Sequence, residues 1–429
     1  MRKTLIALPI GILLLIPSIT FALQDAERVF AAAQTYTTYI KTRIEVPFIG
    51  DERSTFFGAG FVIDTKRRWI LTNAHVTGRS PAAIDVTFSD GTRVAAAPVY
   101  IDPYLDLAVL SYEEPQDFRP RAADLECRSI PGIGHPVGTF GHPEGLRFTG
   151  TRGIISGLSS HFDGEWLQTD APISSGNSGG PLISLQTGRV VGINSSSLEG
   201  DGVQNANFAV LSTHACRIVE LLRKGADPRP ADLGVAFFAY QDEPTLVVGQ
   251  VFSKGRAIGL QRGDQIFAVG GNDLGSGTEG ALLHALRGRL ASSELRLLRA
   301  GRELKLSPKL TPQPSPTDRR GVLVGGALFS ATNFVDMAAI ELGPSLMVHW
   351  VEDGSPAAAA GLSATDHLLA INDIRIRSLD DLLGVLDAQQ PGTPAVLDLL
   401  RLEPYEGQFL WDMLAEFRLD DAEVIEFGQ

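Results

Sequence analysis

Gly176-Asn177-Ser178-Gly179-Gly180-Pro181 is a glycine-rich turn with a serine at its centre. A serine hydroxyl is a weak nucleophile at neutral pH and needs a neighbouring base, and the charge that develops on a substrate carbonyl needs hydrogen-bond donors. The glycines allow a sharp turn in which the N–H groups of Gly176, Asn177 and Ser178 are the candidates for an oxyanion hole. Taken alone, the stretch is also consistent with an ordinary Gly/Ser turn.

A candidate base and a candidate orienting carboxylate lie upstream of this turn. His75 follows an apolar run, residues 69–71, at the end of a predicted strand, and Asp106 heads a second one, residues 107–110. A general base of this kind needs a carboxylate on its far ring nitrogen, which fixes the tautomer and stabilises the imidazolium. The chain order His75, Asp106, Ser178 is that of a chymotrypsin-type triad and differs from the subtilisin and α/β-hydrolase orders.

Each of these residues has a simpler explanation. A histidine at a strand end is commonly a half-buried polar residue, and an aspartate before a strand commonly forms a turn. Asp85, Asp90 and Asp102 compete for the orienting role. Asp106 is preferred because it directly abuts an apolar strand, where a dry cleft can hold it rigidly. The three segments occurring together and in order favour the catalytic interpretation.

Four segments resemble the HtrA/Deg family of trypsin-like serine proteases: Gly58-Ala59-Gly60-Phe61-Val62-Ile63, Thr72-Asn73-Ala74-His75-Val76, Asp106-Leu107-Ala108-Val109-Leu110 and Gly176-Asn177-Ser178-Gly179-Gly180-Pro181-Leu182. With the C-terminal half included, the resemblance covers nearly the whole chain. It implies a double β-barrel protease followed by one or two PDZ domains.

The body of the chain has the pattern of an all-β protein. Residues 44–216 consist of short apolar segments separated by Gly, Pro, Asn and Asp, which is typical of a barrel or sandwich, and residues 211–222 predict a closing helix. The predicted fold is therefore mainly β, with a chymotrypsin-like double six-stranded β-barrel over residues 23–224. His75 and Asp106 would lie on the first barrel and Ser178 on the second, with the active site between them.

The resemblance also implies where a substrate side chain would bind. In the trypsin-like fold the residue six before the serine, here Pro172, lies at the base of the first pocket, and the run Ser195-Ser196-Ser197 forms another wall. A small, uncharged pocket predicts cleavage after Val, Ile, Ala or a similar residue. Ser174-Ser175 departs from the Asn-Pro that is more common in the family. Asp170 is interpreted as structural, and His142 and His161 as loop residues.

The last two hundred residues contain an internal repeat of about a hundred residues. An apolar strand, a Gly-Leu segment (residues 259–260 and 361–362), an Asp-led strand and a helix recur in the same order. The repeat resembles PDZ domains, predicted over 230–312 and, as a divergent copy, over 320–420. PDZ domains accept a C-terminal peptide as an added strand and hold its carboxylate with backbone N–H groups. Leu233-Gly234-Val235 is the candidate loop in the first copy, and Val324-Gly325-Gly326-Ala327 the best candidate in the second.

The N-terminus predicts export. Residues 1–22 read as a secretory signal, with a basic start at Met1-Arg2-Lys3, an apolar run from Leu5 to Phe21 and cleavage after Ala22. An uncleaved membrane anchor is the alternative, because the apolar run approaches a bilayer-spanning length, although two prolines interrupt it. Either way the expected location is a bacterial periplasm.

Further features concern partners and crosslinks. Cys127 and Cys216 are the two cysteines, and whether they pair in an oxidising compartment is left open. The net charge of −13 argues against nucleic acid. No residue spacing supports a metal site, and no cofactor is expected.

Family resemblance suggests trimerisation or higher assembly through N-terminal aromatic residues, here Phe30, Tyr36 and Tyr39; packing of this segment on the barrel is the alternative.

The expected function is that of an exported serine endopeptidase acting on unfolded, misfolded or damaged envelope proteins. Two alternatives stay open: a regulatory protease that senses an exposed C-terminal peptide, and a PDZ-based holding chaperone with little proteolysis. The role of the tail beyond Glu403 is not predicted by its sequence.

Overall fold

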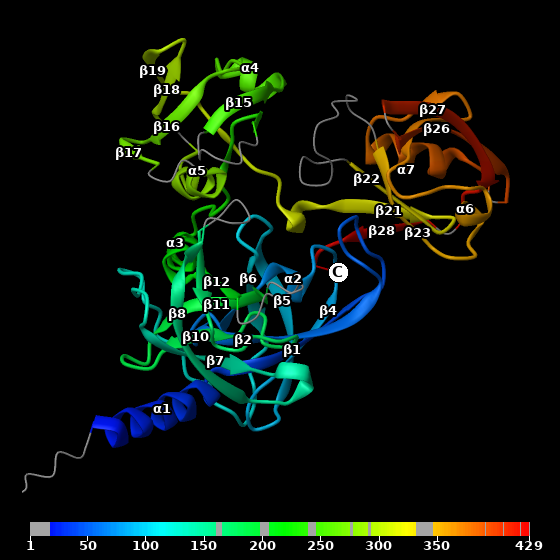
Figure 1. The fold of residues 1–429 in the computed structure, drawn as a ribbon. Coiled ribbons are helices and arrows are strands. Elements are labelled where there is room, and N and C mark those ends of the chain that lie inside the picture. The colour runs from blue at the N-terminus through cyan, green and yellow to red at the C-terminus, as the bar shows by residue number, and fades with distance from the viewer. Residues whose placement is uncertain are drawn as a thin grey trace, which may run out of the picture.

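The structure is a computed structural model that describes residues 18–159, 165–197, 206–238, 246–274, 278–290, 293–331, 346–390, 392–405, 407–420 and 422–428. The greater part of the predicted signal and His161 lie outside these ranges. Two barrels form the body of the molecule, and two smaller domains stand on the same side of it (Figure 1). Helix α1 lies at the opposite end of the molecule from these two domains.

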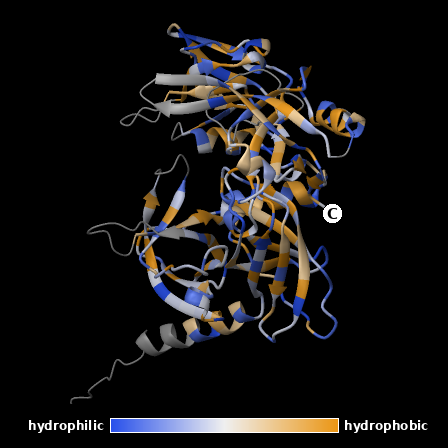
Figure 2. Cartoon of the chain, turned by 90° about the vertical axis from the view of Figure 1, so that its right-hand side faces the viewer, coloured by the Kyte–Doolittle hydropathy of each residue, from blue (hydrophilic) through white to orange (hydrophobic). Residues whose placement is uncertain are grey.

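The first barrel closes in the order β1-β2-β3-β6-β5-β4. Its strands have inward apolar side chains that form one core, and hydrophobic and hydrophilic residues alternate along many of them (Figure 2). The one-turn helix α2 lies between β3 and β4. The elements are β1 Thr37–Ile44, β2 Ser54–Asp64, β3 Trp69–Thr72, α2 Ala74–Thr77, β4 Ala83–Thr87, β5 Arg93–Asp102 and β6 Leu107–Tyr112.

The second barrel closes in the order β10-β11-β12-β9-β8-β7, so the expected pair of six-stranded barrels is confirmed. Helix α3 follows it, and a disulfide joins Cys127 to Cys216 on this helix, which answers the question of their pairing. The elements are β7 Pro136–Gly141, the 3-10 turn η1 Pro143–Gly145, β8 Thr149–Ser159, β9 Trp166–Thr169, β10 Pro181–Ser184, β11 Val190–Ser197, β12 Asn207–Leu211 and α3 Ser212–Arg223.

Helix α1, Ser18–Gln34, packs on the second barrel. Phe30 stacks on Phe140 at 5.9 Å and covers two glycines of β7 and β8. Tyr36 is buried, and Tyr39 stacks on Phe57. These aromatic residues therefore pack within one chain, as in the alternative interpretation of this segment. In the described part of the chain, no helix combines the length and apolar character needed to cross a membrane.

The first C-terminal domain contains a sheet in the order β14-β15-β16-β18-β19, with β14 at one edge. Helix α5 packs on it over a core of buried Leu, Ile and Val side chains. The elements are β13 Ala231–Asp232, β14 Val235–Phe237, β15 Leu246–Val251, α4 Ser253–Ala257, β16 Gln265–Val269, β17 Asn272–Asp273, α5 Glu279–Leu286, β18 Leu295–Arg299, β19 Arg302–Leu306 and β20 Thr311–Pro312.

The second C-terminal domain has a longer sheet, in the order β27-β26-β24-β23-β22-β21-β28. Its last strand, β28, lies beyond residue 420, so the sheet extends past the predicted boundary of this domain. The elements are η3 Pro316–Asp318, β21 Arg320–Val324, β22 Ala327–Ala331, β23 Leu346–Val351, α6 Pro356–Ala359, β24 His367–Ile371, β25 Ile374–Arg375, α7 Leu379–Ala388, β26 Pro394–Tyr405, β27 Gly407–Arg418 and β28 Glu423–Glu426.

Each C-terminal domain contains an ion pair between an arginine and a buried aspartate, at equivalent positions of the repeat. Arg299 Nε donates to Asp264 at 2.7 Å, and Arg401 Nε donates to Asp366 at the same distance. Both aspartates are fully buried and also accept a backbone N–H at the start of the preceding turn. A buried carboxylate needs such partners, which explains why an arginine occupies the equivalent position in each copy of the repeat, at the end of β18 and, contrary to the expected strand end, inside β26.

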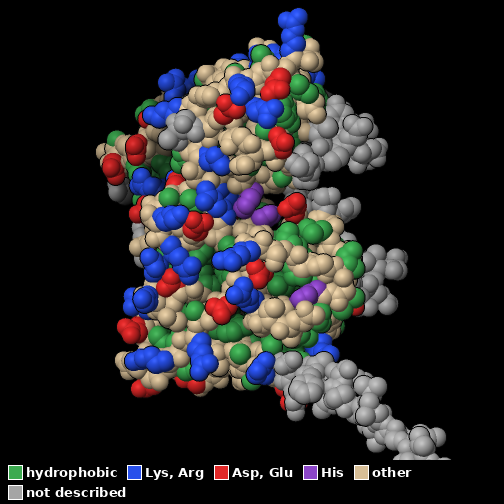
Figure 3. All heavy atoms as spheres, turned by 90° about the vertical axis from the view of Figure 1, so that its left-hand side faces the viewer, with side chains coloured by type: hydrophobic (Ala, Val, Ile, Leu, Met, Phe, Trp, Pro, Cys, Tyr) green, Lys and Arg blue, Asp and Glu red, His purple; other side chains and the backbone are tan. Residues whose placement is uncertain are grey.

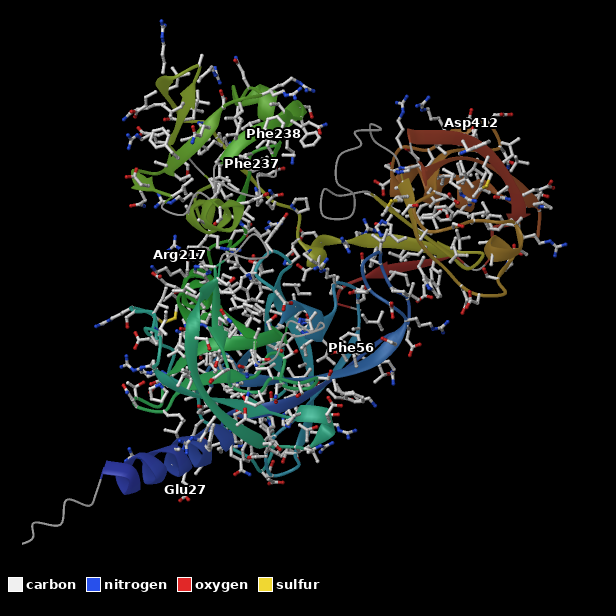
Figure 4. The ribbon with its side chains drawn as sticks, viewed as in Figure 1. Glu27, Phe56, Arg217, Phe237, Phe238 and Asp412 are labelled. Atoms are coloured by element: carbon white, nitrogen blue, oxygen red, sulfur yellow. A yellow bond between two sulfur atoms is a disulfide. The ribbon has the colours of Figure 1, made fainter. Side chains whose placement is uncertain are left out.

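The first C-terminal domain docks on helix α3. His214 of α3 lies 4.3 Å from His284 of α5 between ring centroids, and Arg217 Nη2 donates to the carbonyl of Arg287. Figure 4 shows Arg217 at this junction. The domain is therefore attached next to the helix that closes the second barrel.

Candidate active site

His75 and Asp106 are held together by two hydrogen bonds. Asp106 Oδ2 lies 2.8 Å from His75 Nδ1, and Asp106 Oδ1 accepts the backbone N–H of His75 at 3.0 Å. His75 lies on α2, directly after β3, and Asp106 lies in the turn between β5 and β6 with φ +51°. An Asp at Nδ1 leaves the other ring nitrogen, Nε2, free to act as a base.

The second barrel also supplies a hydrogen bond to Asp106. Ser195 Oγ donates to Asp106 Oδ2 at 2.7 Å, across 89 residues of sequence. Ser195 lies at an irregularity of β11, where the register with β12 shifts between Asn194 and Ser196. It was expected as a pocket wall, and its side chain instead connects the two barrels at the carboxylate. No local spacing in the sequence indicates this contact.

The competing aspartates have other partners. Asp90 accepts from the N–H and hydroxyl of Thr92 in a turn, and Asp85 lies on β4. Asp102 is fully buried and pairs with Arg287 of the first C-terminal domain. Of the four candidates, Asp106 is the one bonded to His75.

Ser178 lies in the turn between β9 and β10 and is half-buried. Its carbonyl accepts the N–H of Ala59 at 2.8 Å, which ties the turn to the first barrel. Its hydroxyl donates to the carbonyl of Ser195 at 2.9 Å. A hydroxyl has one proton to donate, so in this state the Ser178 proton is directed to Ser195 and not to His75.

The turn before Ser178 requires glycine at position 176. Gly176 has φ +96°, and a Cβ there would lie 2.2 Å from the carbonyl oxygen of His142. Asn177 N–H donates to Ser174 O at 2.9 Å, so, unlike the sequence expectation, it is not free to bind an oxyanion. Among the described residues, no hydrogen bond occupies the N–H groups of Gly176 and Ser178.

His142 supports this turn from beneath. Its backbone N–H donates to Gly176 O at 3.2 Å, and its ring Nδ1 accepts from Phe148 N–H at 3.0 Å. Burial lowers the pKa of His142 to about 4, so the ring is neutral near pH 7. His142 is a loop residue as expected, but it is fully buried, and no pattern in the sequence predicts its contact with Gly176.

The expected pocket residues come from two segments, the chain between β9 and β10 and the end of β11. Pro172 is exposed, and its carbonyl accepts from the hydroxyl of Thr151 at 3.0 Å. Ser196 and Ser197 lie on β11, paired with Phe208 and Asn207, and their side chains lie outside the described part. Asp170, interpreted as structural, accepts the N–H of Ile154 at 2.6 Å.

The candidate peptide loop of the first C-terminal domain precedes β14. Leu233 and Val235 are buried in the domain core, so only their backbone can face a peptide. Gly234 has φ +60°, and its N–H donates to Asp232 Oδ1 at 2.8 Å. Phe237 ends this strand, and Phe238 follows it, with its N–H donating to Val247 O at 2.9 Å (Figure 4).

In the second C-terminal domain, Gly325 and Gly326 form a hairpin turn and not an open loop. Val324 pairs with Ala327 across it, and both glycines have positive φ. The best candidate for a second peptide loop therefore joins two paired strands.

Elsewhere the described surface and interior hold no group of acidic, His or Cys side chains suited to a metal ion. Figure 3 shows one face of the molecule, on which Lys and Arg are interspersed with Asp and Glu. That face presents no single-sign field of the kind that attracts nucleic acid.

Comparison with known families and proteins agrees with this geometry. Residues 58–193 match the trypsin-like peptidase domain family, and residues 347–401 match the PDZ domain family. The periplasmic pH-dependent serine endoprotease DegQ of Escherichia coli (strain K12) is 30% identical over 379 residues, covering 82% of this chain and 79% of DegQ. The periplasmic serine endoprotease DegP of the same strain is 28% identical over 364 residues, covering 80% of this chain and 73% of DegP.

Solved structures show the same fold at lower identity. The serine endoprotease from Yersinia pestis superimposes with a TM-score of 0.51 at 24% identity, covering 67% of this chain and 98% of that one. The HtrA-type protease AlgW with a tripeptide gives a TM-score of 0.54 at 24% identity, covering 70% of this chain and 99% of that one.

Proposed function

Since this chain belongs to the HtrA/Deg family of trypsin-like serine endopeptidases with PDZ domains, we propose that it cleaves misfolded or damaged proteins of the bacterial envelope through Ser178, His75 and Asp106. The observation that carries the proposal is the Asp106 carboxylate, which accepts from His75 Nδ1 and from Ser195 of the other barrel. This arrangement is what a general base needs at the junction of two barrels.

The first chemical step uses His75 as the base. Its Nδ1 carries the proton that Asp106 accepts, so Nε2 takes the proton of Ser178 as the oxygen attacks the scissile carbonyl. The imidazolium then delivers this proton to the leaving amine. In the second half of the reaction, Nε2 removes a proton from water as the water attacks the acyl carbonyl. It then returns this proton to the Ser178 oxygen as the ester bond breaks and the acid product leaves.

The tetrahedral oxyanion is stabilised by backbone donors. The N–H groups of Gly176 and Ser178 fill this role, and Asn177 holds the turn through its bond to Ser174. Before attack, the Ser178 hydroxyl must leave the carbonyl of Ser195 and turn to His75. Substrate binding along β11 supplies a reason for that change, because a peptide backbone would compete for the same carbonyl.

The expected substrate preference is for a small aliphatic residue before the cleaved bond. Pro172 carries no charge at the base of the proposed pocket, and Ser196 and Ser197 supply no charge from β11. An uncharged, narrow site gains energy from apolar side chains and leaves Lys or Arg without a partner.

We assign residues 23–224 to the protease domain, 230–312 to the first PDZ domain (PDZ1) and residues from 320 onward to the second (PDZ2). PDZ1 is the candidate receptor for C-terminal peptides, because β14 lies at the edge of its sheet. Leu233, Gly234 and Val235 would hold the carboxylate through their backbone once Gly234 N–H is released from Asp232.

The proposed location is the periplasm, because the curated relatives are periplasmic endoproteases and the first 22 residues read as an export signal. A membrane-anchored form follows if this segment is not cleaved. A homo-trimer or higher oligomer is the proposed assembly by family resemblance. Its contacts would involve residues other than Phe30 and Tyr36, which pack within the chain.

The test is cleavage of unfolded, fluorescently labelled casein by the mature protein and by Ser178→Ala. The proposal predicts cleavage by the wild type alone, with mass spectrometry of the products showing Val, Ile or Ala before the cleaved bonds. Cleavage by both proteins would indicate a contaminating protease, and products ending in Lys or Arg would contradict the uncharged pocket.

The two alternatives give different results in the same assay. A holding chaperone suppresses aggregation of a denatured client equally well with Ser178→Ala. A peptide-sensing protease cleaves casein slowly until a C-terminal peptide is added. The Ser178–Ser195 hydrogen bond favours the peptide-sensing protease over the chaperone, because the Ser178 hydroxyl must turn from Ser195 to His75 before it can react.

A further inference from the structure

The two PDZ domains differ at the strand that would pair with a peptide. In PDZ1 this strand, β14, pairs with β15 alone among the residues that the structure describes. Its counterpart in PDZ2, β22, pairs with β23 on one side and with β21 on the other, from Gly321 opposite Ser330 to Val324 opposite Ala327. PDZ2 therefore offers no outer edge of β22 to an incoming strand.

The chain's own C-terminal segment completes this closure. Strand β28 pairs with the far side of β21, from Arg320 opposite Glu426 to Leu323 opposite Glu423. Ile425 of β28 is buried in a small cluster with Phe48 and Leu328. Since Phe48 comes from the segment between β1 and β2, this cluster fixes PDZ2 on the first barrel.

Polar contacts hold the same interface. His349 Nδ1 accepts the N–H of Ile49 at 3.2 Å, and Arg53 pairs with Glu352 at 2.8 Å. Phe48 N–H in turn donates to Ser80 Oγ at 2.8 Å, and Ser80 lies three residues beyond the end of α2. The segment between β1 and β2 thus connects PDZ2 to Ser80, in the chain that follows helix α2, on which His75 lies.

A second connection reaches the same helix from β28. Phe427, the residue after β28, packs on a cluster of three buried side chains: Ala74 of α2, Ile101 of β5 and Ala108 of β6. Ala74 precedes His75, and Ala108 lies two residues after Asp106. Phe427 therefore packs on a cluster to which both segments that carry the histidine and the aspartate contribute.

From these contacts we propose that the C-terminal segment is a positioning element for the His75–Asp106 pair, with Phe427 as its positioning residue. The inference rests on the proposed protease function. Helix α2 has a single turn, Ala74–Thr77, which is too short to be stable by itself, so its placement depends on what packs against it. The Phe427 side chain packs on the cluster that joins α2 to β6 and so stabilises their relative placement. A displacement of about 1 Å at a catalytic group can cost about a hundredfold in rate.

The experiment compares Phe427→Ala with Phe427→Leu and Glu426→Ala in the full chain. Steady-state cleavage of a peptide gives kcat and KM, and the rate of labelling by a fluorophosphonate gives the reactivity of Ser178. Phe427→Ala is expected to lower kcat and the labelling rate by about tenfold or more with little change in KM. Phe427→Leu should recover much of both, because it refills most of the cavity.

Glu426→Ala is the matched control. It lies on the same strand and loses only an exposed ion pair with Arg320, so kcat should stay at the wild-type value. Hydrogen exchange of β21 and β28 reports whether Phe427→Ala keeps the closed PDZ2 sheet. If that variant unfolds the sheet, Phe427→Leu decides the question: a partial fall in kcat per titrated active site with little change in KM is expected, and a kcat equal to wild type would overturn the positioning role.

The outcomes separate this inference from the proposed function. Wild-type protein that neither cleaves nor is labelled at Ser178 contradicts the protease proposal itself. Active wild type with kcat unchanged in Phe427→Ala overturns the positioning role alone. Loss of stability with kcat per titrated site unchanged would show that Phe427 is merely structural and would also overturn it.

Discussion

Arg287 of PDZ1 and Asp102 of the first barrel form an ion pair in which both side chains are fully buried, with 2.5 Å between Nη1 and Oδ2. Asp102 also accepts the hydroxyl of Tyr100 and the N–H groups of Tyr104 and Leu105. Burial, together with the charge of Asp102, raises the pKa of Tyr100, so it stays a neutral donor. The carboxylate thereby fixes the turn that leads to Asp106 and joins it to PDZ1.

Replacing Arg287 with Met is therefore expected to destabilise the protein strongly. It leaves Asp102 charged and buried without its partner, which typically costs about 3–5 kcal/mol. Urea unfolding followed by intrinsic fluorescence measures the change. The double variant Arg287→Met with Asp102→Asn should recover a large part of the loss, because the uncompensated charge is gone. Equal stability of wild type and Arg287→Met would show that the pair contributes nothing.

Ser195→Ala is expected to slow catalysis without unfolding the protein. It removes one hydrogen bond to a carboxylate, worth about 1.5–3 kcal/mol, and leaves Asp106 less firmly oriented toward His75. A fall in kcat of about tenfold or more follows if most of this energy acts in the transition state. The measurement is steady-state peptide hydrolysis. Ser212→Ala, which removes another buried hydroxyl, at the start of α3, from Glu126 O, should leave kcat unchanged.

Much of the catalytic arrangement follows from the sequence because its parts are local. Gly176 to Gly180 and the strand ends before His75 and Asp106 have patterns that depend on near neighbours, and the double barrel follows from short apolar segments. The contact between Ser195 and Asp106 joins residues on two barrels, and no local pattern encodes it.

The C-terminal strand β28 likewise depends on a long-range contact that no local sequence pattern predicts. Strand β28 has four residues, and its pairing with β21 joins positions about a hundred residues apart, such as Arg320 and Glu426. A strand this short is stable only through its partner, so its own composition carries little signal. The closed edge of β22 was likewise hidden, because Gly325-Gly326 fits a peptide-binding loop as well as a hairpin turn.

Gly176→Ala tests the oxyanion turn. The added Cβ would lie 2.2 Å from His142 O at φ +96°, so the turn must move and carry the N–H groups of residues 176 and 178 out of place. Loss of an oxyanion donor typically costs about a hundredfold to a thousandfold in kcat, which steady-state hydrolysis would detect. Gly91→Ala is the matched control: its φ is +92°, and no atom lies within 4 Å of the added Cβ. A Gly176→Ala variant as active as Gly91→Ala would contradict the role of this turn.

The contact between PDZ2 and the first barrel is expected to weaken in acid. Burial, together with the charge of Arg319 and the nearby His367, lowers the pKa of His349 to about 3 from its ordinary 6.5. Folded His349 is neutral, with Nδ1 accepting from Ile49 N–H, whereas the unfolded chain binds a proton below about pH 6.5. The free energy of unfolding should therefore fall by about 1.4 kcal/mol per pH unit between about pH 6.5 and pH 3 from this group.

Comparison with His349→Gln isolates this contribution from the carboxylates and the other histidines. Glutamine offers an acceptor to Ile49 N–H and does not titrate. The free energy of unfolding of the variant should therefore fall less steeply with decreasing pH, by the contribution of the one proton that His349 binds in the unfolded wild type. The measurement is urea unfolding of both proteins at about pH 7, 6 and 5. The stability difference should shift in favour of the variant at each lower pH, and a constant difference would mean that His349 takes up its proton equally well in the folded protein.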